Sequence, residues 1–327
     1  MGLFMEKPKK ELPFRDIFRK ILPDEADGAL EVLQFCDDGE GEVRKYNVYK
    51  VMADGKSYVL KKSDAYEKSV YQDFLAEGSF RVPGFYGSTE AGGSLFILLE
   101  YIAGSDLRDF TEDMAYACAD SITAIMNAYW QKDEPEFQAG KQDGRFERYW
   151  ARINKRAACL AGEPELAWAY NVFLERQKTC PRTLCNGDFL QYNAIFSKGS
   201  VYVTDWAFAG VMPYSLDIAR LIAHGREDRP TFPFYMTAEQ RRIYVNEVYG
   251  KLKEKPDWEQ YLTDICLALL NEYVEFIEYE LNHPEEERDK VFAYYYSHAK
   301  ALAAGIHEKT EEGRWNSDHA LTFITER

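Results

Sequence analysis

The 327-residue chain lacks the long apolar segment that a membrane-spanning helix requires. Its longest obvious apolar run, Leu95 to Leu99, is far shorter than the roughly 20 residues that cross a bilayer. The N-terminus carries Lys7, Lys9 and Lys10, but no apolar stretch long enough for a secretory signal. We therefore expect a protein with no membrane attachment.

The chain also lacks a basic surplus and a clustered set of cysteines. Its formal net charge is -15, whereas sequence-independent nucleic-acid binding needs a basic surface that displaces counterions from phosphate. An anionic ligand must therefore meet local positive charge or a metal. Six cysteines scattered through a long chain do not form a disulfide framework, which fits the reducing cytoplasm.

The chain has enough hydrophobic residues to form a large core, since 46% of the residues are hydrophobic and 15% are aromatic. The first hundred residues contain Phe14 to Leu22 at helical spacing, a helical segment at Ala65 to Ala76, and strand-like runs between turn residues. The runs are Leu30–Phe35, Tyr46–Met52, Ser57–Lys61, Val82–Tyr86 and Leu95–Tyr101, with Asp54–Gly55 and Gly92–Gly93 as turns. This pattern predicts a small antiparallel sheet.

After Gly104 the hydrophobic pattern becomes helical and stays so for most of the chain. Thr237 with Gln240 three residues later predicts a capping box. Two short strands, Ala194–Phe196 and Val201–Thr204, interrupt the helices. We predict an α+β chain with an N-terminal lobe at residues 1–102 and a helical C-terminal lobe at residues 103–327.

The strongest chemical signal is Asn-Gly-Asp at residues 186–188, closed by Asn193 and followed by Asp205 at the end of a strand. Phosphoryl transfer needs a carboxylate for the attacking hydroxyl and oxygen ligands for Mg²⁺. Asp188 suits the first task. Asn193 and Asp205 suit the second, because an amide and a carboxylate are both hard oxygen ligands.

These motifs resemble the aminoglycoside phosphotransferase and choline kinase superfamily, whose catalytic loop begins His-Gly-Asp or His-Asn-Asp. The resemblance implies a protein-kinase-like bilobal fold, Asp188 as catalytic base, and Asn193 and Asp205 as Mg²⁺ ligands, with ATP or GTP as co-substrate. Asn186 replaces the family histidine but can still form hydrogen bonds. The same resemblance gives Asp217 a structural role, as a helix N-cap or a loop anchor.

Further segments of the resemblance concern the nucleotide. Lys61 in Val-Leu-Lys corresponds to the phosphate-binding lysine and Glu67 to its ion-pair partner, with Lys62 expected to face solvent. Gly39 and Gly41 form either a phosphate-binding glycine loop or a plain hairpin turn. The backbone of Glu100 and Ile102 would meet the nucleobase.

The acceptor should be small, because the short gap from Asp205 to Asp217 leaves no room for a peptide-docking activation segment. The predicted C-terminal lobe holds 26 basic and 37 acidic residues, so it carries -11 of the -15 charge. Its candidate substrate contacts are acidic and aromatic and suit an ammonium group, although a solvated acidic helix over an aromatic core explains them as well. They are Trp206, Glu272, Glu275 and Tyr279.

Three functional hypotheses follow. The first is a kinase of a small cationic alcohol, either an aminoglycoside or a choline-like amino alcohol. The second is a kinase of a neutral metabolite such as a sugar, a nucleoside-like compound or homoserine. The third is a catalytically silent pseudokinase that binds a ligand or partner. The sequence leaves the oligomeric state open.

Overall fold

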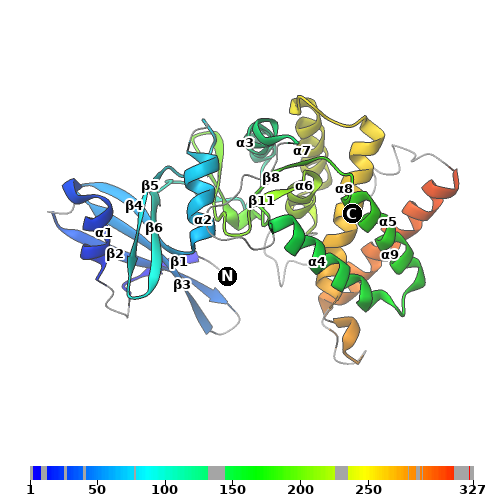
Figure 1. Cartoon of the computed structure of the whole chain (residues 1–327), viewed down its shortest axis with the longest axis horizontal. Coiled ribbons are helices and arrows are strands. Elements are labelled where there is room, and N and C mark those ends of the chain that lie inside the picture. Colours follow the sequence, from blue (N-terminus) through cyan, green and yellow to red (C-terminus); the bar gives the residue numbers. More distant parts are fainter. Residues whose placement is uncertain are drawn as a thin grey trace. The chain divides into compact units, whose positions relative to one another are not determined.

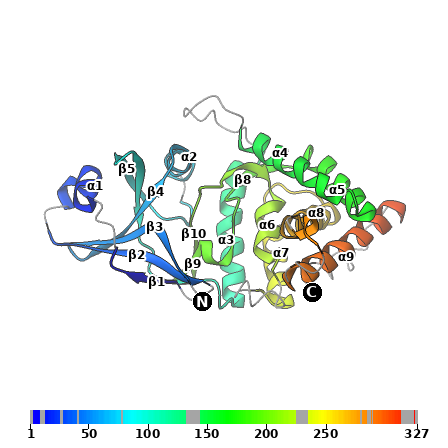
Figure 2. The same cartoon turned by 90° about the horizontal axis from the view of Figure 1, so that it is seen from below.

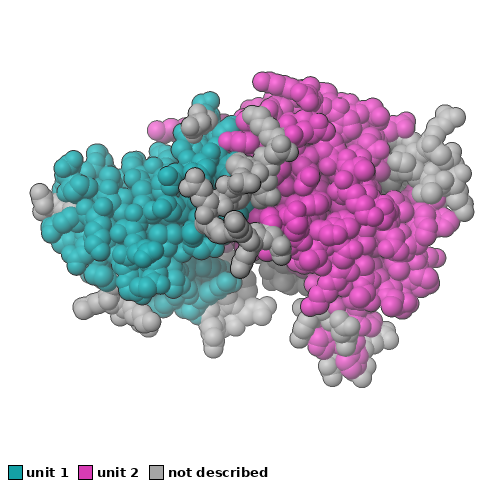
Figure 3. All heavy atoms as spheres, in the orientation of Figure 1, with its two compact units in different colours: residues 1–104, 137–140, 204–207 teal, residues 105–136, 141–203, 208–327 magenta. Residues whose placement is uncertain are grey.

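The structure, a computed structural model, describes residues 3–8, 13–25, 28–39, 42–76, 79–131, 144–224, 235–278, 280–284, 288, 290–312 and 324. The chain forms two compact units, coloured separately in Figure 3. The described part of unit 1 comes from Met1–Gly104 and Thr204–Ala207. That of unit 2 comes from Ser105–Glu136, Lys141–Val203 and Phe208–Arg327. The predicted lobe boundary after residue 102 stays a prediction.

Unit 1 is built on a six-stranded antiparallel sheet in the order β1-β2-β3-β4-β6-β5 (Figure 1). Its strands are β1 (Leu3–Glu6), β2 (Leu30–Gly39), β3 (Glu42–Ala53), β4 (Lys56–Ser63), β5 (Phe85–Ala91) and β6 (Ser94–Glu100). Asp54–Gly55 and Gly92–Gly93 join neighbouring strands as two-residue turns with positive φ at all four positions. Such turns match the twist of the strands, and both were predicted.

One face of this sheet is covered by α1 (Phe14–Ile21), whose Ile17 and Phe18 are buried against Tyr58 and Leu60 of β4. Successive side chains of a strand point to opposite faces, so Lys61 points away from α1. The predicted helix at Ala65–Ala76 is present as α2 (Ala65–Ser69), which continues as a wider π-helix over Val70–Leu75. A short 3₁₀ turn, Pro23–Glu25, follows α1.

Two element boundaries expected from the sequence need correction in unit 1, and one strand was not expected. The strand predicted at Val82–Tyr86 begins only at Phe85, because Pro83 has no N–H to donate to a ladder. Gly39 is the last residue of β2 and pairs with Glu42, so it lies in the ladder. Strand β1 was not predicted, because its partner β2 lies about thirty residues away in sequence.

Unit 2 consists mainly of helices, which Figures 1 and 2 show from two directions. They are α3 (Glu112–Tyr129), α4 (Arg145–Ala157), α5 (Pro164–Gln177), α6 (Ser215–Ile222), α7 (Ala238–Lys251), α8 (Trp258–Ile277) and α9 (Lys290–Glu312), with 3₁₀ turns at Ala158–Leu160, Gln191–Asn193 and Glu280–Asn282. The predicted capping box of Thr237 and Gln240 opens α7. None of the described helices could span a membrane.

Helix α8 lies at the centre of unit 2, packed against α5, α6 and α9. It is buried without interruption from Tyr261 to Val274, which is why its sequence is apolar on nearly all sides. The buried stretch nevertheless includes Asp264, Asn271 and Glu272. Each of these has a hydrogen-bonded partner, as burial of a polar group requires.

Short strands hold the loop that contains the Asn-Gly-Asp motif. Strand β8 (Arg182–Cys185) pairs with β11 (Gly210–Pro213), and β9 (Ala194–Ser197) lies between β10 (Ser200–Val203) and β7 (Ser105–Asp106). The loop therefore leaves one small sheet and enters another. Strands β9 and β10 were predicted, whereas β7, β8 and β11 have at most four residues and give little periodic signal.

Candidate functional site

The functional residues of unit 1 gather around the ammonium group of Lys61. Its Nζ lies 2.6 Å from a carboxylate oxygen of Glu67 and 2.8 Å from one of Asp205. Glu67 is fixed from two sides, because Ser63 donates to its other oxygen at 2.7 Å and its backbone N–H donates to the N-capping Asp64. The predicted pair of Lys61 and Glu67 is therefore formed, with Asp205 as a second anion.

The two carboxylates differ in exposure and thus in availability. The Glu67 side chain is 2% exposed, whereas that of Asp205 is 44% exposed. Burial lowers the pKa of Lys61, but the charges of Asp205 and Glu67 outweigh that effect and the net pKa is raised. Lys61 is thus a stable cation anchored by Glu67, and Asp205 is the partner that a ligand can reach.

The predicted nucleobase segment begins at Glu100, the last residue of β6. The backbone N–H of Glu100 donates to the carbonyl oxygen of Gly84 at 2.7 Å, and its carboxylate accepts from the N–H of Gly84. Glu100 could therefore meet a nucleobase only through its carbonyl oxygen. Ile102 is buried and Lys62 is exposed. Gly41 lies outside the described residues.

In unit 2, Asp217 fixes the backbone of the Asn-Gly-Asp loop. Its buried carboxylate accepts the N–H of Asn186 at 2.6 Å and that of Gly187 at 2.9 Å. Burial raises the pKa of Asp217 to about 6, although these two hydrogen bonds oppose the rise. Tyr214 holds the N-cap position of α6, so the geometry of Asp217 is that of a loop anchor.

The backbone conformation at position 187 requires a glycine. Its φ is +81°, a region that L side chains rarely adopt, and a Cβ there would overlap the carbonyl oxygen of Phe208. The side-chain oxygen of Asn186 accepts the N–H of Asp188 at 3.2 Å, so Asn186 acts as a hydrogen-bonding brace. The backbone in front of Asp188 is thereby held in one conformation.

The carboxylate of Asp188 is held on both oxygens. Its Oδ1 accepts Nε and Nη2 of Arg220 at 3.1 and 2.9 Å, and its Oδ2 accepts Nδ2 of Asn193 at 3.0 Å. A carboxylate offers about four acceptor sites, so one site remains, on Oδ2. Asn193 also donates the same nitrogen to the carbonyl oxygen of Asp188, which leaves its amide oxygen as a possible cation ligand.

Asn193 and Asp205 lie at the two ends of the hairpin that β9 and β10 form. Val203, the last residue of β10, is paired with Ala194, and Asn193 directly precedes Ala194. Asp205 is the second residue after Val203. Within the described part of the chain, no three His, Cys, Asp or Glu side chains form a metal site, so a cation would also need amide and phosphate oxygens. Magnesium commonly binds proteins in this way.

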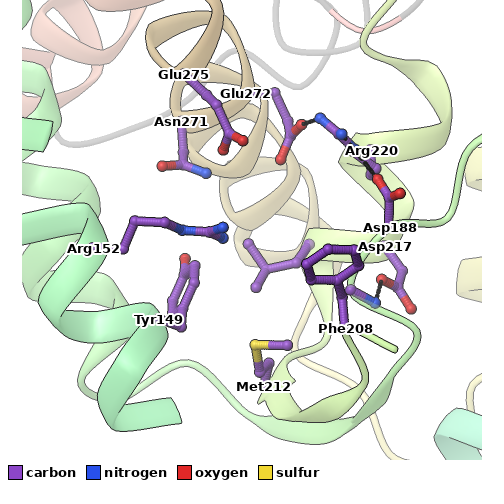
Figure 4. A pocket seen from close by; sticks show the side chains of 12 residues that line it. Tyr149, Arg152, Asp188, Phe208, Met212, Asp217, Arg220, Asn271, Glu272 and Glu275 are labelled. Carbon is purple, nitrogen blue, oxygen red and sulfur yellow. Dashed lines mark hydrogen bonds and ion pairs between the residues drawn. The ribbon is translucent and has the colours of Figure 1, made fainter. Parts of the chain in front are cut away.

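Asp188 opens onto a pocket of about 220 Å³ that lies wholly within unit 2 (Figure 4). Helices α4, α6 and α8 and the segment after Phe208 form its walls. Its charged lining consists of four carboxylates and two guanidinium groups, a formal charge of -2. These groups belong to Asp188, Asp217, Glu272, Glu275, Arg152 and Arg220.

Two of the four predicted substrate contacts line this pocket. Glu272 is paired with Arg220 at 2.7 Å, and Glu275 is paired with Arg156 at 2.8 Å. Trp206 belongs to unit 1, is 1% exposed and is not part of this lining, so its burial supports packing and gives no support to substrate contact. Tyr279 lies outside the described residues.

Arg220 and Arg152 were missed from the sequence. A detectable signal existed for Arg220, because it follows Asp217 by three residues and therefore lies on the same face of the predicted helix. No comparable signal existed for Arg152, which reaches the pocket from α4, more than thirty residues before Asp188. Only the packing of α4 against β11 and α8 brings it there.

Solved structures that resemble this chain share its fold at low sequence identity. A choline/ethanolamine kinase family protein from Mesorhizobium loti is 14% identical, with a TM-score of 0.57 and coverage of 96% of this chain and 99% of its own. Amicoumacin kinase hAmiN, in complex with AMP-PNP, Ca²⁺ and Ami, is 15% identical, with a TM-score of 0.54 and coverage of 80% and 85%.

A thermostable mutant of aminoglycoside phosphotransferase APH(4)-Ia, with AMP-PNP and hygromycin B, is 15% identical, with a TM-score of 0.54 and coverage of 89% and 98%. These likenesses show the protein-kinase-like α+β fold that the motifs predicted. No curated protein sequence matches the chain. Residues 44–254, which include Lys61, Asp188, Asn193 and Asp205, match the model of the phosphotransferase enzyme family, and the chain belongs to that family.

Proposed function

We propose that this phosphotransferase moves the γ-phosphate of ATP or GTP to a hydroxyl group of a small, cationic molecule. The observation that carries the proposal is the state of Asp188, an anchored carboxylate with one open acceptor site facing a small pocket. A carboxylate so placed can orient a hydroxyl group and accept its proton.

In the proposed reaction, the acceptor oxygen attacks the γ-phosphorus as the bond from that phosphorus to the bridging oxygen breaks. The nucleoside diphosphate leaves, and the hydroxyl proton passes to Oδ2 of Asp188. Asp217 and Asn186 keep the Asp188 backbone in place during transfer. Lys61, which Glu67 anchors, binds the phosphates as a point charge.

Magnesium, when bound, would neutralise charge on the phosphates. We assign its protein ligands as the amide oxygen of Asn193 and the carboxylate of Asp205. The free amide oxygen of Asn193 and the exposure of Asp205 support this assignment. The carbonyl oxygen of Glu100 and the backbone of Ile102 remain our proposed contacts for the nucleobase.

The pocket supports a small cation as acceptor. Its formal charge of -2 attracts an ammonium group, and its volume of about 220 Å³ lies below the roughly 300–1,000 Å³ of pockets that hold drug-sized ligands. This size favours an amino alcohol over a multi-ring aminoglycoside. We also keep the cytoplasm as the proposed location, because the six cysteines are all free thiols.

A coupled assay for ADP or GDP release tests the proposal. Amino alcohols, aminoglycosides and sugars are supplied in turn with Mg²⁺ and either nucleotide. Asp188→Asn should reduce acceptor-dependent release about 10³-fold, whereas Asp113→Asn, on an exposed turn of α3, should leave it unchanged. Unchanged turnover in Asp188→Asn would refute the mechanism.

Two outcomes would support the alternatives instead. Turnover only with acceptors that lack an ammonium group, such as sugars, would support a kinase of neutral metabolites. Absence of a metal-dependent thermal shift with both nucleotides would support a silent binding protein. The intact set of Lys61, Asp188, Asn193 and Asp205 argues against the silent protein, because each side chain that the transfer requires is present.

A further inference from the structure

The charged groups that line the pocket in unit 2 differ in the number of their ion-pair and hydrogen-bond partners. Arg220 is ion-paired with both Asp188 and Glu272, and Arg156 binds one oxygen of Glu275. By contrast, the Arg152 guanidinium makes no hydrogen bond or ion pair with any residue that the structure describes. All five of its N–H groups are therefore available to a ligand, whereas Arg220 already uses three of its five.

Arg152 has a defined position. It belongs to α4, three residues after the buried Tyr149 and four before the buried Arg156, so it lies on the same side of the helix as these residues. Its side chain is itself exposed where it lines the pocket. Figure 4 shows its side chain extending from α4 into the pocket, across from Asn271 and Glu275 of α8. A guanidinium presents a planar set of donors that matches a carboxylate.

Glu275 provides the complementary group beside it. Its side chain is 31% exposed, and Arg156 occupies only its Oε2. Burial raises the pKa of Glu275, but the guanidinium groups of Arg156, Arg220 and Arg152 lower it by more than burial raises it. The net pKa is lowered, so the carboxylate is ionised at neutral pH. Its Oε1 has no partner within the described part of the chain and can accept from an ammonium group.

We propose that the acceptor is a hydroxy amino acid whose carboxylate is bound by Arg152, whose ammonium group is bound by Glu275 and whose hydroxyl group is presented to Asp188. In an amino acid the two charged groups are attached to one carbon, which matches a neighbouring arginine and glutamate. The inference rests on the proposed function and deepens it, since the acceptor keeps the ammonium group and carries a carboxylate beside it.

The test compares acceptors that differ only in a carboxylate. Homoserine is matched with 3-aminopropan-1-ol, and serine with ethanolamine, in the assay for nucleoside diphosphate release. The wild-type protein should show kcat/KM at least about tenfold higher for one of the acids than for its matched amine. Arg152→Ala should raise KM for that acid about tenfold or more, with little change in kcat and none in KM for the amine.

Two further variants separate binding by Arg152 from general effects. Arg152→Lys should recover part of the loss, because the charge remains although the planar set of donors does not. Lys155→Ala removes an exposed positive charge from the same helix, away from the pocket lining, and should change neither KM. An equal loss in Arg152→Ala and Lys155→Ala would overturn the proposal.

The remaining outcomes are decisive as well. Amines used as well as the acids, with turnover that requires Asp188, would overturn this inference and leave the proposed function standing. An unchanged acid-to-amine ratio in Arg152→Ala would do the same. Absence of Asp188-dependent turnover with every acceptor tested would overturn the inference together with the proposed function.

Discussion

The candidate functional residues of each unit include a cation that lies between two carboxylates. In unit 1, Lys61 lies between Glu67, 2% exposed, and Asp205, 44% exposed. In unit 2, Arg220 lies between Glu272, 8% exposed, and Asp188, 21% exposed. In both, the buried acid anchors the cation and the more exposed acid faces outward.

The difference lies in the cation. The Lys61 ammonium is a compact point charge on a flexible side chain, whereas the Arg220 guanidinium is planar and binds Oδ1 of Asp188 through two N–H groups. A lysine therefore suits a position at which the cation exchanges a carboxylate partner for a phosphate group. Arginine suits a group that holds a reactive carboxylate in a fixed orientation.

The largest effect should come from the exposed acid of unit 1. We expect Asp205→Asn to reduce acceptor-dependent nucleotide turnover about 10³-fold, because it removes a proposed cation ligand. Stability should change little, since an ion pair this exposed contributes little to folding. Measured kcat and thermal midpoints check this, with Asp73→Asn on an exposed position as control. Retention of a tenth of wild-type activity would rule out the ligand role.

The buried acids should distinguish the two cations. Glu67→Gln and Glu272→Gln should each lower the free energy of unfolding by about 3 kcal/mol at pH 7, because each leaves a buried charge undercompensated. The raised pKa of Lys61 stabilises the folded state only while the unfolded lysine is protonated, so the loss in Glu67→Gln should shrink above about pH 10.4. The loss in Glu272→Gln should persist there, because arginine stays charged. Urea unfolding below and above that pH measures both losses, and equal behaviour of the two variants would contradict the prediction.

The smallest effect concerns Asp217, whose pKa of about 6 lies above the value near 3.9 of an unfolded aspartate. Protonation removes its charge from the N–H groups of Asn186 and Gly187, so kcat should fall about tenfold from pH 7 to pH 5. The folded state binds more protons between pH 6 and 4, so this group increases stability as pH falls there. A kcat–pH profile checks this, and an acid limb that persists in Asp217→Asn would count against it.

Much of unit 1 could be predicted from the sequence because its signals are local. Asp54–Gly55 and Gly92–Gly93 define hairpins within a few residues, and the alternation in β4 separates Lys61 from Tyr58 and Leu60. The strand boundaries were less certain, as Phe85 and Gly39 show, because pairing partners decide where a ladder starts and stops.

The pocket in unit 2 was harder to predict because its residues come from three separate helices. Glu272 and Glu275 read as acids suited to a substrate ammonium, yet both are ion-paired with arginines that lie about 50 and 120 residues earlier in the chain. No sequence window contains such a pair. The same reason hid Arg152, an ordinary helix arginine until α4 is placed beside the pocket.

The sequence alone determined the chemical inventory and its order, from Lys61 and Glu67 through Asp188 and Asn193 to Asp205, because phosphoryl transfer restricts residue types and spacing. The tertiary structure decided which of these charges are already paired. Pairing depends on distances between residues far apart in the chain, and burial determines whether an ion pair forms. Thus Arg220 is paired with Asp188 and Glu272 and Arg156 with Glu275, whereas Arg152 has no ion-paired partner among the described residues.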